Sequence, residues 1–262
     1  MTSLDLNGPL EELYERTRHM RQALAAVEAL ATGQQMHSAR PHADLDQIGL
    51  PTSNTANSMA LIFLASIFEE FYRQEITQCA EYLVERYAGV THQIKLSARQ
   101  SYWTAFIEKA RFMKSVTTVV KKERQLDVGA VIHARSVIES VRAFALLDDV
   151  STLNSAVFAE HSRNFKPTVV NEIGSRLGMR DVVGQAAEFA AVRKYFSVTS
   201  KVESAERLNL KLEEFYGIRN SIVHSLNANR GYGVDTVFEY IELFECYSDG
   251  LRAAISRHVA AW

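Results

Sequence analysis

The chain has 262 residues, of which 47% are hydrophobic and 23% charged, and its formal net charge is −2. These proportions are typical of a globular protein with a sizeable core, and they exclude general disorder and a bulk polycation held to nucleic acid by charge alone. Its 12 glycines and 4 prolines are few for this length, which argues against a turn-rich β sandwich or barrel and favours long helices.

Apolar residues at helical spacing predict a first helix over residues 9–31. The polar stretch over residues 32–57 contains two glycines and two prolines and predicts a linker. We therefore interpret residues 1–52 as an N-terminal helical arm with its linker, and residues 53–262 as one helical domain. Further helices are expected from an N-cap at Asn57 or Ser58 to Tyr87, and over 96–120, 127–147, 151–164, 168–177, 181–195, 204–225 and 234–260.

Sustained alternation of apolar and polar residues, the pattern of a half-buried strand, is not found in the sequence. The predicted fold class is therefore all-α. We expect a bundle of four to five long antiparallel helices, with short helices inserted between the middle ones.

Redox and targeting features favour a cytoplasmic protein. The cysteines, Cys79 and Cys246, lack the spacing of a zinc site or of a disulfide framework. The apolar run over residues 59–68 is too short to span a bilayer, and the acidic N-terminus lacks the pattern of a signal peptide, so we expect no membrane association. The eight histidines form no HxxxH or HExxH pair, and we expect neither a metal nor another cofactor.

The hexapeptide RNSIVH, residues 219–224, ends one of the predicted long helices. Asn220 and His224 are four residues apart and share a helix face, whereas Arg219 lies about 100° around the axis from Asn220 and about 140° from His224. One straight helix does not aim all three at a small target, but two copies related by a two-fold axis can converge on a shared cleft. An imidazole beside a guanidinium supplies the proton shuttle and the anion clamp that phosphodiester chemistry needs.

A purely structural interpretation of the same residues stays open. Asn220 and His224 can cap the helix end, with Asn227 terminating it, while Arg219 pairs with Glu213 or Glu214 on the surface. An Arg and a His at this spacing also occur by chance in helical proteins.

The Arg-Asn-x-x-x-His motif, preceded by the aromatic and aliphatic residues Phe215, Tyr216 and Ile218, resembles the signature of the HEPN superfamily. Two other segments add to the resemblance. The apolar run at residues 61–72, with its acidic and aromatic residues, is similar to the early HEPN helix. Residues 164–173 and 176–178 are similar to an intermediate segment of the RiboL-PSP-type HEPN families. The resemblance covers roughly residues 57–258 and leaves the N-terminal arm outside.

This resemblance implies an all-α homodimer that acts as a metal-independent endoribonuclease on single-stranded RNA or tRNA, as a toxin or an anti-phage effector. Arg219 would hold the scissile phosphate, His224 would act in general acid–base catalysis, and Asn220 would orient one of them. Glu69, at a family-like acidic position, would be a supporting acid or a structural partner between helices. An antitoxin or another defence protein would be a further partner.

Residues 95–124 carry the strongest local excess of positive charge, interleaved with Tyr102, Trp103, Phe106 and Phe112. Cations that hold the backbone and rings that stack on bases predict an RNA-guiding role, but the same pattern is typical of an amphipathic helix with a basic outer face. The candidate RNA-binding residues are Lys109, Arg111, Lys114, Lys121 and Lys122.

Two other pairs, His133 with Arg135 and His161 with Arg163, are candidates for phosphate contacts, although we favour solvated positions for them. Two further functions stay open for the whole chain. In the first, the chain is a non-catalytic HEPN-like module that binds RNA or a protein partner. In the second, the motif is accidental and the chain is an unrelated helical adaptor.

Overall fold

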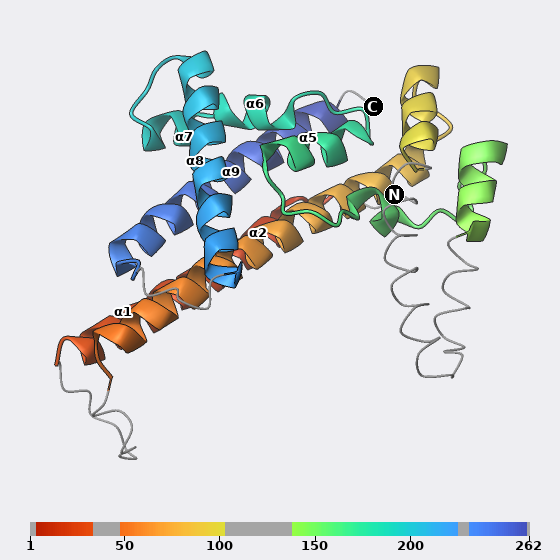
Figure 1. Cartoon of the computed structure of the whole chain (residues 1–262). Coiled ribbons are helices and arrows are strands. Elements are labelled where there is room, and N and C mark those ends of the chain that lie inside the picture. The colour runs from red at the N-terminus through yellow and green to blue at the C-terminus, as the bar shows by residue number, and fades with distance from the viewer. Residues whose placement is uncertain (1–3, 34–47, 103–137, 225–230, 261–262) are drawn as a thin grey trace, which may run out of the picture. The chain divides into compact units, whose positions relative to one another are not determined.

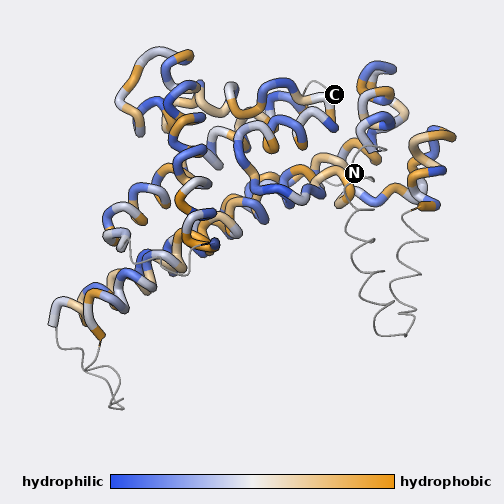
Figure 2. The backbone as a smooth tube through the Cα atoms, in the orientation of Figure 1, coloured by the Kyte–Doolittle hydropathy of each residue, from blue (hydrophilic) through white to orange (hydrophobic). Residues whose placement is uncertain are grey.

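The computed structural model describes residues 4–33, 48–102, 138–224 and 231–260, and within these ranges it contains helices and no strand (Figure 1). The prediction of an all-α fold is confirmed. Hydrophobic and hydrophilic residues alternate along the helices, as amphipathic helices that bury one face require (Figure 2). Within the described ranges no helix combines the length and the apolar character that crossing a bilayer requires.

The long helices are α1 (Asn7–Ala31), α2 (Leu50–Arg86), α8 (Lys201–His224) and α9 (Val234–Val259). Short helices connect them, as expected from the sequence, but the helix predicted over residues 151–164 is wrong, because only Ser155–Ala159 is helical there, as a 3-10 helix. The short helices are the π-helix η2 (Arg142–Leu146), the 3-10 helix η3 (Ser155–Ala159), and the α-helices α5 (Pro167–Ser175), α6 (Val182–Ala187) and α7 (Ala190–Tyr195). The single helix predicted over residues 181–195 is wrong, because Phe189, with an extended backbone at ψ 144°, separates α6 from α7.

The start predicted for the second helix is also wrong. α2 begins at Leu50 rather than at Asn57 or Ser58, so residues 50–57 are helical and not part of a linker. Pro51 fits the first turn, because the N–H that proline lacks has no helical partner there. Two polar side chains then hold this turn in place. The hydroxyl of Ser53 donates to Glu28 Oε2 at 2.7 Å, and Asn57 Nδ2 donates to the carbonyl of Tyr232 at 2.8 Å.

The chain divides into two compact units. The first unit comprises Met1–Leu6, Tyr72–Gln185 and Leu251–Trp262, and the second comprises Asn7–Phe71 and Ala186–Gly250. Helix α1 belongs to the second unit, where the phenol of Tyr14 donates to Asp249 on α9 at 2.6 Å. This division does not coincide with the boundary at residue 53, and the arm-plus-domain interpretation stays a prediction.

Aromatic rings form the core of the second unit. The ring centroid of Phe68 on α2 lies 4.8 Å from that of Phe244 and 5.2 Å from that of Tyr247, both on α9. Phe215 of α8 packs edge-on against Phe244 at 4.7 Å. Such pairs add about 1 kcal/mol each to the gain from burying their area, so this cluster holds α2, α8 and α9 together and fixes the direction in which α8 ends.

The first unit has a second aromatic core with polar anchors. Tyr102 packs against Phe144 at 5.3 Å and Phe158 at 5.2 Å, and its hydroxyl bonds to Ser140 Oγ at 2.7 Å. Tyr102 has no solvent exposure, so for this ring the amphipathic-helix interpretation is confirmed and stacking on RNA bases is excluded.

Candidate functional site

The residues of the predicted site lie in the last two turns of α8. Arg219 and Asn220 are half-buried, and His224, the final residue of the helix, is exposed. An exposed imidazole is open to solvent and to a ligand, as a proton shuttle needs.

Arg219 makes a polar contact with its neighbour. Its Nη1 donates to Asn220 Oδ1 at 3.3 Å, a long and therefore weak hydrogen bond. Its Nε is shielded from solvent and has no hydrogen-bond acceptor within the described part of the chain. A shielded donor without an acceptor costs about 1–3 kcal/mol. Because solvent does not reach this N–H, an anion would meet the terminal N–H groups of the half-buried guanidinium instead.

The contact with Asn220 brings the Arg219 side chain toward the helix face that Asn220 shares with His224. Although the Cα of Arg219 lies about 100° from that of Asn220 around the axis, the long arginine side chain reaches back to the asparagine. Asn220 shares its face with His224, one turn further on. The guanidinium is thereby directed toward the face that carries the other two candidate residues.

Of the two surface partners considered for Arg219, Glu214 forms no ion pair with it among the described residues. Among the described residues the polar partner of Arg219 is Asn220, and Glu214 instead pairs with Lys211 Nζ at 3.2 Å. Asn227, the proposed helix terminator, lies outside the described residues.

Glu69 lies on α2 in the second unit, as α8 does, and is half-buried. Its catalytic or structural role stays a prediction. The five candidate RNA-binding residues fall outside the described ranges, as do the aromatic residues interleaved with them after Tyr102 and the pair His133 and Arg135. They are Lys109, Arg111, Lys114, Lys121 and Lys122.

The favoured solvated position of His161 is wrong. The residue is 8% exposed, and its Nδ1 accepts the backbone N–H of Arg163 at 3.0 Å. An accepting Nδ1 places the proton of the neutral ring on Nε2, which lies 3.4 Å from Glu172 Oε1. Arg163 stays exposed and pairs with the other oxygen of Glu172 at 2.7 Å. A histidine fixed in this way is part of the internal structure of the first unit.

Arg176, a buried cation that sequence reasoning did not single out, completes this cluster. It is 3% exposed, and its Nη1 donates to the carbonyls of Phe158 at 2.8 Å and Glu160 at 2.6 Å. Its Nη2 lies 3.7 Å from Glu172 Oε1. Because one guanidinium joins η3 to α5, Arg176 acts as a cross-link within the first unit.

Glu75 on α2 is a second buried ionisable residue that sequence reasoning missed. It has no solvent exposure, and neither carboxylate oxygen has a hydrogen-bond partner among the described residues. Burial raises the pKa of Glu75 to about 8, against the pull of Arg252 and with a smaller contribution from Asp5. No motif surrounds it in the sequence, so only the three-dimensional packing identifies it.

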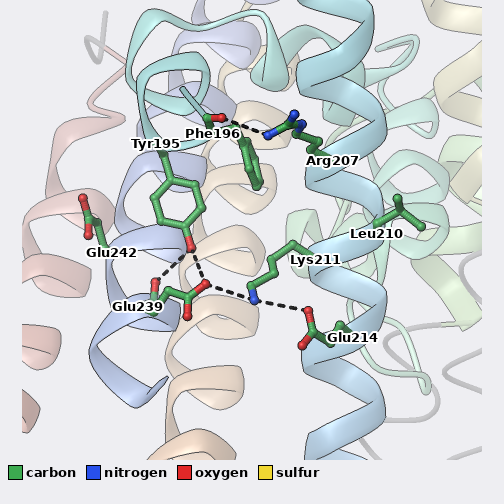
Figure 3. A pocket seen from close by; sticks show the side chains of 8 residues that line it. All are labelled: Tyr195, Phe196, Arg207, Leu210, Lys211, Glu214, Glu239 and Glu242. Carbon is green, nitrogen blue, oxygen red and sulfur yellow. Dashed lines mark hydrogen bonds and ion pairs between the residues drawn. The ribbon is translucent and has the colours of Figure 1, made fainter. Parts of the chain in front are cut away.

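A pocket of about 610 Å³ in the second unit was also missed (Figure 3). It combines aromatic, basic and acidic side chains from α7, α8, α9 and the residue after α7. None of them belongs to the predicted site. The lining residues are Tyr195, Phe196, Arg207, Leu210, Lys211, Glu214, Glu239 and Glu242.

Metal-binding geometry is absent from the described residues, where no three histidine, cysteine or acidic side chains are grouped as ligands. Comparisons with known proteins add no assignment, since no family model, curated protein or solved structure matches the chain. The resemblance to the HEPN superfamily therefore rests on the sequence motifs alone.

Proposed function

We propose that the chain is a metal-independent endoribonuclease whose site consists of Arg219, Asn220 and His224. The observation that carries this proposal is the contact of the Arg219 guanidinium with Asn220, one turn before an exposed histidine at the end of α8. This arrangement supports the guanidinium as the anion-binding group and the imidazole as the proton carrier of the proposed site.

In the proposed reaction the 2′-hydroxyl of the RNA attacks the adjacent phosphorus. The bond from phosphorus to the 5′-oxygen breaks, which leaves a 2′,3′-cyclic phosphate and a 5′-hydroxyl. One proton leaves the nucleophile and one reaches the leaving oxygen. His224 of one subunit accepts the first, and the same histidine of a second copy donates the second.

Arg219 stabilises the negative charge that develops on the phosphate in the transition state. The Nε is shielded from solvent, so the terminal N–H groups of the half-buried guanidinium would be the ones that hold a phosphate oxygen. Asn220 holds the guanidinium through Nη1 before substrate arrives, which reduces the cost of orienting it. Glu69 is a candidate supporting acid on the same unit.

The proposed enzyme is a cytoplasmic homodimer, restrained by an antitoxin or another defence protein. Gly217 and Ser221 are exposed on α8 and lie on the same helix face as His224. A Cβ at Gly217 would meet no atom within 4 Å in the described chain. A glycine within a helix costs about 1 kcal/mol relative to alanine, and no described neighbour requires this one. Close approach of a second α8 would account for it.

The test compares the purified full chain with its Arg219→Ala and His224→Ala variants on single-stranded RNA and tRNA in excess EDTA. Each variant is expected to lose at least about 100-fold in cleavage rate, because an acid–base group or a charge clamp contributes about that much. Product ends identified by mass spectrometry should carry the 2′,3′-cyclic phosphate.

Matched controls are His92→Ala and Arg180→Ala, which remove the same side-chain types at exposed positions of the first unit. Both should cleave RNA at the wild-type rate. Equal cleavage by all five proteins, or none by the wild type under any condition that keeps it folded, would contradict the proposal. The second result would favour the non-catalytic module.

A further inference from the structure

The pocket of the second unit has one wall of aromatic rings and an exposed leucine at its edge. The rings of Tyr195 and Phe196 meet edge-to-face at 4.8 Å and 88°. Leu210 of α8 is 72% exposed although it lines the pocket. A partner side chain with an aliphatic stem would bury this apolar surface.

Most of the charge inside the pocket is already paired. Lys211 Nζ lies 3.0 Å from Glu239 Oε1 and 3.2 Å from Glu214 Oε2 (Figure 3). It also lies 4.9 Å from the ring centroid of Tyr240. The pocket therefore already holds one ammonium group of the chain itself. Arg207 is paired as well, since its Nη2 lies 2.6 Å from Glu203 Oε1 and its Nη1 donates to the carbonyl of Phe196 at 3.2 Å (Figure 3).

Glu242 is the acidic lining residue whose charge is not matched. It is exposed, and it makes no hydrogen bond or ion pair with any described residue. Its negative potential reaches the aromatic wall, since burial and then the carboxylates of Glu239 and Glu242 raise the pKa of the Tyr195 phenol. In Figure 3 these two carboxylates lie on α9 beside the Tyr195 side chain.

We propose that this pocket binds an arginine side chain of a protein partner. A guanidinium is flat enough to stack on the rings, carries the charge that Glu242 lacks, and presents parallel N–H groups to a carboxylate. An RNA phosphate is a poor occupant, because three carboxylates line the pocket. The inference does not depend on the nuclease proposal, since no residue of that site lines the pocket.

The test titrates the full ¹⁵N-labelled chain with the peptide Ac-Gly-Leu-Arg-Leu-Gly-NH₂, followed by NMR chemical shifts. Two matched peptides carry lysine or citrulline in place of arginine, and citrulline keeps the shape of the side chain without its charge. The arginine peptide is expected to bind up to about fivefold more tightly than the citrulline peptide, since an ion pair with an exposed carboxylate contributes at most about 1 kcal/mol. It should also bind more tightly than the lysine peptide, because only the guanidinium is flat enough to stack on the rings and presents parallel N–H groups to the carboxylate.

Four variants locate the effect. Glu242→Gln should weaken binding of the arginine peptide by up to about fivefold, whereas Glu15→Gln, the same charge change at an exposed position of α1, should change its affinity less than about 1.5-fold. Lys211→Met removes the competing ammonium and should tighten binding, while Lys201→Met, outside the pocket, should not.

Several results would overturn the proposal. Equal affinity of the arginine and citrulline peptides would exclude recognition of charge, and equal affinity of the arginine and lysine peptides would exclude recognition of a guanidinium. Shifts of the pocket signals by a hexa-adenylate RNA, but not by the arginine peptide, would assign the pocket to nucleic acid instead. Glu242→Gln is expected to leave the rate of RNA cleavage unchanged, which separates this inference from the proposed nuclease.

Discussion

The two units of the molecule bury different kinds of polar side chain. Among the described residues, the ionisable groups under 9% exposure other than tyrosine and cysteine lie in the first unit, and they are Glu75, His161 and Arg176. The buried polar groups of the second unit are hydroxyls and one amide, set around the aromatic cluster of Phe68, Phe215 and Phe244. Charges of the second unit lie at its surface, in the pocket and at the end of α8.

Because of this difference, the stability of the two units depends on different interactions. A buried charge costs several kcal/mol unless it is paired, so the stability of the first unit depends on its hydrogen bonds and on pH. A core of rings and hydroxyls does not titrate in the physiological range. Surface charges of the second unit can therefore titrate or be substituted without destabilising its core.

The largest expected effect comes from Arg176→Met, which removes the cross-link between η3 and α5. The substitution removes the donor to the carbonyls of Phe158 and Glu160, and it removes the positive charge that lies 3.7 Å from Glu172 Oε1. The free energy of unfolding should therefore fall by about 3–5 kcal/mol in urea titrations. Arg180→Met, at an exposed position, should change it by less than about 0.5 kcal/mol. Similar values for the two variants would contradict the structural role of the buried guanidinium.

Glu75→Gln should have a smaller effect of opposite sign. The folded state raises the pKa of Glu75 from 4.5 to about 8, so across that range it holds a proton that the unfolded state releases, and stability falls as pH rises. At pH 7 the substitution should therefore raise the free energy of unfolding by about 3 kcal/mol. The gain should shrink toward pH 4.5 and disappear below it.

Urea unfolding at several pH values checks this prediction, with Glu81→Gln on the exposed side of α2 as the control. The control should show no gain that depends on pH between 5 and 8 beyond about 0.5 kcal/mol. A Glu75→Gln variant that is less stable than the wild type at pH 8 would mean that the carboxylate is paired in the folded protein.

The smallest effect is expected in the second unit. Gly217→Ala should raise the free energy of unfolding by about 1 kcal/mol at low protein concentration, because alanine favours the helix and its Cβ meets open space. Gly250→Ala is the matched control, since a Cβ there would lie 2.6 Å from the carbonyl oxygen of Ala186 and should destabilise the chain. A destabilising Gly217→Ala would show that a neighbour already occupies this face.

Secondary structure followed from local patterns, because helix formation depends on residues three and four positions apart. The lengths of α1, α8 and α9 agree with the sequence prediction to within three residues at each end. The start of α2 differs from the prediction, because Pro51 is equally compatible with a linker and with a first helical turn. The contacts of Ser53 with Glu28 and of Asn57 with Tyr232 favour the helix, and they join residues distant in the chain.

The sequence alone determined that this protein is helical and that Arg219, Asn220 and His224 stand at the end of one long helix. Only the tertiary structure turned the Arg219 guanidinium toward Asn220, buried Glu75 and His161, and gathered three helices around an acidic and aromatic pocket. The reason is physical: periodicity records which face of a helix is apolar, whereas the environment of a charge depends on groups that packing brings from elsewhere in the chain.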